Sequence, residues 1–297
     1  MFRIQALALV VTVAGAAASA EPADYASPQD ALDAMVAALE ARDHEALLTV
    51  FGPEAEDLLF TGEPELDSEH RARLLDAYGA GYRFGPRDEG GVDILLGADG
   101  WPFPIPLVSD DGSWHFDIEA GREELQDREI GLNELDVIAL LQAYVDLQAE
   151  YRLVDHDGDG VMEFAASVIS SDGAHDGLYW DGEDSPVGIR MARASADGFN
   201  DGEADHAPDP YAGYFYRILD GQGPDAPGGE MSYLVNGHML AGHALIAFPA
   251  VYGETGINTF LVSENGEVLE ADLGEDTLAV ADAIRLYDPG PDWGPVD

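Results

Sequence analysis

The sequence predicts an α+β protein: N-terminal helices with a small antiparallel sheet, one long central helix, and a β-rich C-terminal lobe. Three observations support this fold class. Apolar residues recur with helical spacing over residues 28–79, a longer helical pattern covers 122–153, and strand-like segments fill the last third. The predicted parts are 1–20, 21–120, 121–154 and 155–297.

The first part, residues 1–20, has the pattern of a signal peptide. Met1 to Arg3 give a positive start, 4–13 are apolar, and Ala18-Ser19-Ala20 is the kind of site that signal peptidase accepts. We therefore expect cleavage near Ala20 and a periplasmic or extracellular protein; an uncleaved membrane anchor is the alternative. No later segment is long and apolar enough to predict an integral membrane span in the mature chain.

Three helices are predicted at the start of the N-terminal lobe (21–120). Ser27 is a suitable N-cap for the first helix, with Pro28 in its first turn. Asp43 opens the second helix in the same way. Ser68 is the expected N-cap of the third, which ends at Gly79.

Strands are expected next, at 92–96, 103–108 and 114–118, with a turn at 110–112 joining the last two. Helices followed by a meander predict a curved sheet wrapped on helices, as in NTF2-like or cystatin-like folds.

The helix predicted for 122–153 makes up most of the connecting part, 121–154. Its apolar residues follow one stripe, and Gly131-Leu132-Asn133 is the expected break. The segment 170–210 is predicted to be loop with one short helix at 189–196. Later strands are expected at 211–219, 231–235, 243–248, 257–263 and 267–271, followed by a helix over 276–286. Asn265-Gly266 predicts a hairpin turn between the last two strands, because Asn-Gly readily adopts positive φ.

The composition excludes several chemistries. The chain has 59 acidic and 13 basic residues, a net charge of −46, no Cys, and only Arg among its basic residues. Without Cys or Lys there are no disulfides, thiol nucleophiles, P-loop lysines or Schiff bases.

A surface this acidic repels nucleic acid and favours cations, a basic protein or an envelope partner. Adaptation to a saline habitat and a GC-rich genome both explain the missing Lys.

The best candidate site is the acidic loop 155–163. Carboxylates at alternate positions of a tight loop converge on one point, and Ca²⁺ prefers six to eight oxygen ligands. Gly160 permits the sharp turn, and the long helix arrives at Asp155 as an entering helix does in an EF-hand. The predicted calcium ligands are Asp155, Asp157, Asp159, the carbonyl of Val161, and Glu163.

One position departs from that pattern. Position twelve of the loop is Ala166, where an EF-hand has a bidentate Glu. We expect weaker affinity, or a contribution from Asp172 or Asp176. A metal-free acidic turn remains the alternative reading.

Two further pairs of residues bear on possible catalytic or metal chemistry. His115 and Asp117, two residues apart on a predicted strand, share one face and are the candidate acid–base pair; a solvated sheet face is the alternative. His238 and His243 are five residues apart, which places them on opposite faces of a continuous strand and argues against a zinc pair.

Segments along nearly the whole mature chain resemble the DUF2950 family of secreted bacterial proteins, whose function is unassigned. The most specific is Trp-Pro-Phe-Pro-Ile-Pro-Leu at 101–107. The resemblance implies export and a bacterial source, and it brings no catalytic residues. An aromatic is expected in that pattern where His243 stands. The other segments that resemble this family are 114–117, 120–124, 130–134, 157–160, 176–180, 223–229, 252–256 and 272–274.

A looser resemblance joins 211–266 to the β-domain of type IV pilin-like proteins. The functional hypothesis is an exported, non-enzymatic envelope or secreted binding or accessory protein with a structural Ca²⁺ loop. The alternatives are a carboxylate- and His-dependent hydrolase with its cleft in the N-terminal lobe, and a pilus or secretion accessory protein.

Overall fold

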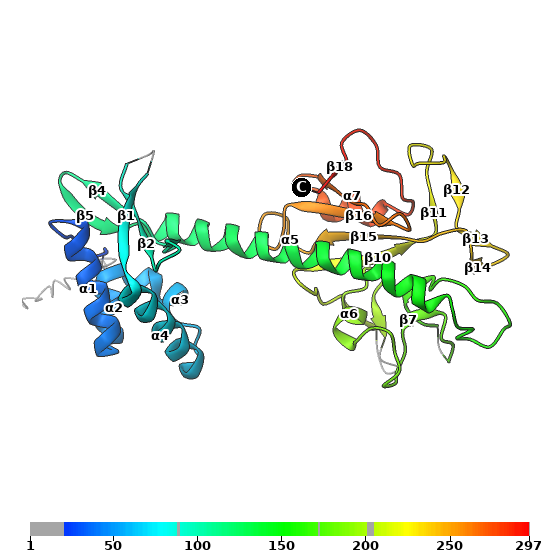
Figure 1. The fold of residues 1–297 in the computed structure, drawn as a ribbon, viewed down its shortest axis with the longest axis horizontal. Helices are drawn as coiled ribbons and strands as arrows, with labels where there is room; N and C mark the ends of the chain where they lie inside the picture. The colour runs from blue at the N-terminus through cyan, green and yellow to red at the C-terminus, as the bar shows by residue number, and fades with distance from the viewer. Residues whose placement is uncertain (1–20, 88–89, 172, 201–204, 297) are drawn as a thin grey trace, which may run out of the picture. The chain divides into compact units, whose positions relative to one another are not determined.

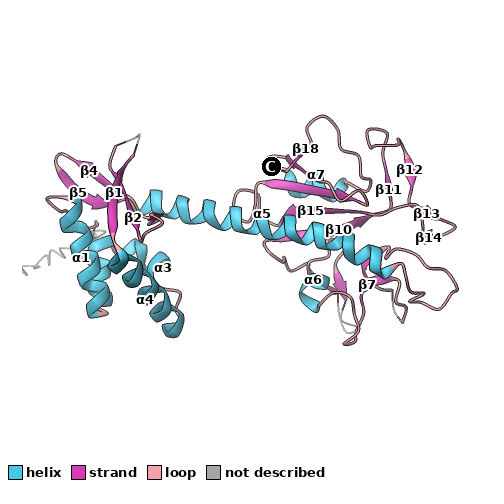
Figure 2. Ribbon diagram, in the orientation of Figure 1, coloured by secondary structure: helices cyan, strands magenta, loops and turns pink. Residues whose placement is uncertain are grey.

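The computed structural model describes residues 21–87, 90–171, 173–200 and 205–296 (Figure 1). The chain divides into two compact units, one ending at Leu125 and the other beginning at Gln126. The architecture is α+β, as predicted, with several helices and mainly antiparallel sheets (Figure 2). The predicted signal peptide, 1–20, lies outside the described residues. Within them, no helix has the length and apolar character that crossing a membrane requires.

The N-terminal unit begins with helices whose starts follow local capping rules. Ser27 Oγ accepts a hydrogen bond from the Asp30 amide at 3.2 Å, and Asp43 Oδ1 accepts one from the Ala46 amide at 3.0 Å. Both predicted caps are therefore confirmed. The helices are α1 (Pro28–Ala41), α2 (His44–Phe51), the 3₁₀ turn η1 (Pro53–Ala55), α3 (Glu56–Leu59) and α4 (Pro64–Ala80).

Helix α4 corrects the prediction for the third helix. It begins at Pro64 instead of Ser68, because proline is well suited to the first turn of a helix. Ser68 lies inside the helix, where its hydroxyl accepts a hydrogen bond from Arg71 at 2.7 Å.

The sheet of this unit is antiparallel, with the order β1-β2-β4-β5 and β3 paired to β2. The strand expected at 103–108 is wrong over most of its length, because Pro104 and Pro106 have no amide hydrogen to donate. The turn at Asp111-Gly112 is confirmed, and both residues have positive φ. The strands are β1 (Tyr82–Pro86), β2 (Val92–Leu96), β3 (Trp101–Pro102), β4 (Leu107–Asp110) and β5 (Ser113–Phe116).

The core of this unit lies between the helices and one face of the sheet. Phe51, Phe103 and Phe116 form an aromatic cluster, with the Phe51 and Phe116 ring centroids 4.4 Å apart. Leu32 and Met35 of α1 are buried beside them. Burial of these side chains holds the helices on the sheet.

Helix α5 (Ile118–Tyr151) begins in the first unit and continues in the second. It starts four residues earlier than predicted, after Asp117, whose Oδ1 accepts a hydrogen bond from the Ala120 amide at 3.1 Å. The expected break at Gly131-Leu132-Asn133 is wrong. The Asn133 side chain donates to the Thr255 carbonyl at 3.1 Å, and Ile130 and Val137 are buried. Tertiary contacts outweigh the low helix propensity of glycine.

The C-terminal unit is built on an antiparallel sheet of order β10-β15-β16-β17-β18. Asn265-Gly266 forms the predicted hairpin between β16 and β17, with Gly266 at φ 77°. The terminal strand β18 was not predicted. The strands are β10 (Tyr214–Leu219), β15 (Ala244–Pro249), β16 (Asn258–Ser263), β17 (Val268–Asp272) and β18 (Gly294–Pro295).

Short elements surround this sheet. The single strand expected at 231–235 is instead two short strands with different partners. The short helix predicted after residue 189 and the terminal helix are confirmed as α6 (Ile189–Arg193) and α7 (Thr277–Ala283). The strand pairs are β6 (Ser167–Ile169) with β7 (Gly177–Tyr179), β8 (Phe199–Asn200) with β9 (Asp205–His206), β11 (Gly221–Gln222) with β12 (Met231–Ser232), and β13 (Leu234–Val235) with β14 (His238–Met239).

Within this unit, helix α5 packs against the sheet (Figure 1). Glu134 Oε1 accepts hydrogen bonds from the amides of Ile257 and Asn258, each at 2.9 Å, at the start of β16. Nearer the end of the helix, the Tyr144 hydroxyl donates to the Ala244 carbonyl at 3.3 Å. These contacts fix the end of α5, from which the acidic loop leaves.

Candidate functional site

The acidic loop follows the end of helix α5 and is shaped by its own side chains. Asp155 Oδ1 accepts a hydrogen bond from the Gly158 amide at 2.8 Å, and its Oδ2 accepts one from the Gly160 amide at 3.0 Å. Gly158 and Gly160 have φ values of 77° and 92°, which favour glycine. The sequence therefore folds this segment into a tight turn around Asp155.

Three of the predicted ligands lie together in this turn. Oxygen atoms of Asp155, Asp157 and Asp159 all lie within 4.8 Å of one another. Asp157 Oδ1 accepts from the Asp159 amide at 3.2 Å, and Asp159 Oδ1 accepts from the Val161 amide at 2.7 Å. These carboxylates at alternate positions form a set of hard oxygen donors of the kind that Ca²⁺ prefers.

Glu163 belongs to a neighbouring group that shares Asp159. Its Oε1 lies 3.2 Å from His238 Nδ1, and Asp159 Oδ2 lies 3.3 Å from the same nitrogen. Glu163 Oε2 accepts a hydrogen bond from the Met239 amide at 2.6 Å. Asp159, Glu163 and His238 are thus a second set of donors that could hold a metal ion.

Sequence reasoning considered His238 only together with His243 and did not place it beside the acidic loop. The signal was present in Asn236-Gly237, the same dipeptide that predicted the later hairpin. Both residues have positive φ, and the turn pairs β13 with β14 and brings His238 to the acidic loop. The hydrogen bond to Glu163, and the negative charges of Glu163 and Asp159, raise the pKa of His238 above its ordinary value.

The loop has no carboxylate at position twelve. Ala166 occupies it, and its amide donates to the Asp176 carbonyl at 3.2 Å. The Asp176 carboxylate accepts from the Ser171 amide at 2.7 Å and from the Ser171 hydroxyl at 2.8 Å, so it caps its own turn. Asp172, the other expected contributor, lies outside the described residues.

The candidate acid–base residues have different partners. His115 Nδ1 lies 3.8 Å from Asp24 Oδ1, and the His115 side chain is 26% exposed. Asp117 follows β5 and caps helix α5. Each residue thus has a structural contact of its own, and no contact between the two side chains is seen.

His243 is buried in the C-terminal unit, away from any group of metal donors among the described residues. Its ring lies 4.7 Å from that of Phe164 and 5.2 Å from that of Tyr144. Burial, with a smaller contribution from the charge of Arg152, lowers the pKa of His243 to about 4. His243 is a neutral aromatic core residue at neutral pH, so the arrangement offers no zinc pair with His238.

The match to known proteins agrees with the resemblance of the sequence segments. The family model described as "Protein of unknown function (DUF2950)" matches residues 23–296. Neither a curated protein nor a solved structure matches the chain, and the pilin-like resemblance is not confirmed. The family model covers nearly the whole chain, including both units and the acidic loop, and the chain therefore belongs to the DUF2950 family.

Proposed function

We propose that this protein is an exported, non-enzymatic binding or accessory protein whose C-terminal unit is stabilised by Ca²⁺ in the acidic loop 155–163. One observation carries the calcium proposal: the carboxylates of Asp155, Asp157 and Asp159 converge within 4.8 Å at the end of a long helix. Like charges this close together destabilise the folded loop unless a bound cation or dissolved salt offsets their repulsion.

The ligand set favours Ca²⁺ over smaller or softer ions. The three Asp side chains and the Val161 carbonyl at position seven supply oxygen donors. Glu163 at position nine, whose carboxylate is held by His238 and the Met239 amide, acts through a bridging water, and further water completes the shell. The bidentate Glu of position twelve is missing, so we expect affinity in the range of extracellular calcium modules, on the order of 10⁻⁴ to 10⁻³ M. An extracytoplasmic medium would keep such a weak site occupied.

The contacts of the loop favour a structural role for the ion. The residues directly after the loop are held on both sides: the Phe164 amide donates to the Met239 carbonyl at 2.9 Å, and the Ala165 amide donates to Gln148 Oε1 at 2.9 Å. Gln148 lies in helix α5 and Met239 in β14. An ion that fixes the loop therefore fixes the end of the helix to the β13–β14 hairpin.

The charge of the chain supports the proposed location. A net charge of −46 destabilises a compact protein through self-repulsion, and salt and divalent cations relieve it. The signal-peptide pattern of residues 1–20 predicts export into the periplasm or the medium, where calcium can bind.

The hydrolase alternative receives no such support. Its candidate residues, His115 and Asp117, contact Asp24 and the first turn of α5 respectively. No specific observation favours the pilus-accessory alternative, so the binding role is the proposal.

Thermal unfolding tests the structural role. At Ca²⁺ concentrations ten to a hundred times the dissociation constant, a site of this class adds roughly 1.4 to 2.7 kcal/mol and raises Tm by about 3 to 10 °C. The Tm shift produced by the same concentrations of Mg²⁺, added in place of Ca²⁺, measures the contribution of general charge screening. The shift should disappear in Asp157→Ala/Asp159→Ala and persist in Asp146→Ala/Glu150→Ala, which removes two exposed charges from α5. Equal shifts in both variants would contradict a structural role for the loop.

A further inference from the structure

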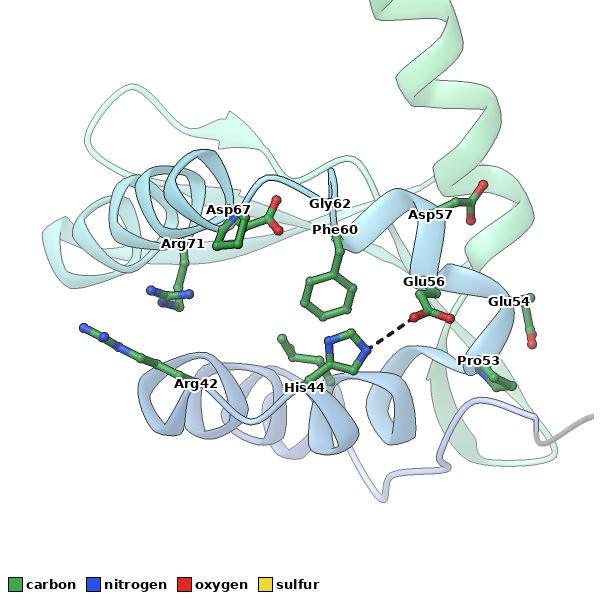
Figure 3. Close-up of a pocket in the computed structure, with 12 residues that line it drawn as sticks. Arg42, His44, Pro53, Glu54, Glu56, Asp57, Phe60, Gly62, Asp67 and Arg71 are labelled. Carbon is green, nitrogen blue, oxygen red and sulfur yellow. Dashed lines mark ion pairs between the residues drawn. The ribbon is translucent and has the colours of Figure 1, made fainter.

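The N-terminal unit contains an open cleft of about 700 Å³ beside an apolar cavity of about 190 Å³. Figure 3 shows the cleft between α2, the α3 segment and α4. The two spaces adjoin each other and share four lining residues. These are Leu47, Phe60, Asp67 and Arg71.

The inner cavity is apolar except at its α4 side. Helix α4 presents Asp67, Arg71 and Leu74 along one stripe, at the four- and three-residue spacing that places side chains on the same face. The other walls come from α1, α2, the α3 segment, the segment 103–105 after β3, and Leu125 of α5. The apolar wall residues include Met35, Leu39, Phe51, Leu58 and Phe103.

Two arginines face the same end of the outer cleft. Figure 3 shows Arg42, which follows α1, and Arg71, from α4, extending into this end from opposite walls. Arg42 has a φ of 55°, an uncommon conformation for a residue other than glycine, asparagine or aspartate. Positive charges on two sides of one cleft repel each other, and an anion bound between them would offset that repulsion.

Neither of these guanidinium groups has an ion-pair partner among the described residues. The Arg71 guanidinium donates a hydrogen bond to the Ser68 hydroxyl, a neutral acceptor, at 2.7 Å, and its charge acts on the Asp67 carboxylate without forming an ion pair. By contrast, the guanidinium groups of Arg122 and Arg217 lie 2.6 and 2.8 Å from carboxylate oxygens. In a chain with 59 acidic and 13 basic residues, two arginines that line one cleft without an ion pair favour the binding of an external anion there.

Three of the four carboxylates that line the cleft are already engaged. Asp67 Oδ1 accepts two hydrogen bonds from Thr61, and these lower the pKa of Asp67. Glu56 lies 3.5 Å from His44, and Asp57 binds Arg122. Figure 3 shows Glu54, Glu56 and Asp57 at the end of the cleft away from the two arginines. Asp67 lies beside Arg71, and the charge of Arg71 also lowers the pKa of Asp67. The two arginines still outweigh this one carboxylate, so this end of the cleft is the more positive one, and Arg71 also lines the apolar cavity.

We propose that this cleft binds a single-chain amphipathic carboxylate, a fatty acid, with its head group between Arg42 and Arg71 and its acyl chain in the apolar cavity. Guanidinium groups match the geometry of a carboxylate and bind it with charge-assisted hydrogen bonds. The inference rests on the proposed function in taking the protein as a binder, and it names the class of ligand.

Titration calorimetry of the purified protein with decanoate, below its micellar concentration, tests the proposal. We expect one decanoate per chain and at least about tenfold weaker binding of decan-1-ol, which has the same chain without the charge. Arg42→Gln/Arg71→Gln should weaken decanoate binding by about tenfold or more. Arg73→Gln/Arg83→Gln removes two charges from the same unit outside the cleft and should leave binding unchanged.

A second variant tests the position of the acyl chain. Leu74→Trp fills the inner cavity and should abolish decanoate binding while Tm and circular dichroism remain close to those of the wild type. The proposal is overturned if decanoate does not bind, if decan-1-ol binds equally well, or if the two double variants lose affinity equally. A Ca²⁺ titration of the same preparation reports on the loop in the other unit, so the two proposals fail separately.

Discussion

Replacing His243 with Phe should change the way in which stability depends on pH. His243 is 1% exposed, and its Nδ1 has no hydrogen-bond partner among the described residues. Because burial removes the ring from water, its pKa is lowered to about 4, against 6.5 for the free side chain. Phe keeps an aromatic ring beside Tyr144 and Phe164 without a group that can take up a proton.

The expected magnitude follows from the two pKa values. Between pH 6.5 and about 4 the unfolded chain binds a proton at His243 and the folded chain does not, so stability falls as the pH falls through this window. A group with these values lowers the free energy of unfolding by about 2 kcal/mol between pH 7 and pH 5. The loss of unfolding free energy that is due to His243 reaches its full size below about pH 4.

Urea unfolding of the wild type and His243→Phe at pH 7 and pH 5, at one fixed Ca²⁺ concentration, measures this effect. The many carboxylates titrate in both proteins, so only the difference between the proteins is informative. We expect the variant to gain about 2 kcal/mol relative to the wild type on going to pH 5. An equal pH dependence in both would refute the assignment of His243 as a buried neutral group.

Two further contacts give predictions. Arg217→Met removes the hydrogen bond and the positive charge that hold the pKa of Asp282 below its ordinary value. NMR titration should therefore show a higher pKa for Asp282 in the variant than in the wild type. An unchanged pKa would exclude the ion pair. Gln148→Leu leaves the amide and carbonyl of Ala165 without their partners in α5, and urea unfolding should show a loss of about 2 to 4 kcal/mol. A loss below about 0.5 kcal/mol would mean that these bonds do not hold the segment after the loop.

Features determined by neighbouring residues were predictable from the sequence. The caps at Ser27 and Asp43 act on amides three residues away, and the turn at Asp111-Gly112 needs only the positive φ of its two residues. The acidic loop belongs to this class. Asp155 bonds to amides three and five residues later, so the convergence of its carboxylates follows from the local pattern.

Features that depend on distant partners were not predictable. Helix α5 continues through Gly131 because Asn133 and its neighbours contact a segment more than a hundred residues later. His238 reaches Glu163 only when the β13–β14 hairpin docks beside the loop. The cleft in the N-terminal unit was also missed, since Arg42 follows α1, Arg71 lies in α4, and no periodic pattern relates them.

The most direct test of the account is calcium titration of the loop 155–163 by isothermal calorimetry. Wild type and Asp146→Ala/Glu150→Ala should each bind one Ca²⁺ at this site, and Asp157→Ala/Asp159→Ala should show no saturable heat because it removes two of the three converging carboxylates. Equal heats in the wild type and Asp157→Ala/Asp159→Ala, with equal Tm values, would contradict the calcium site.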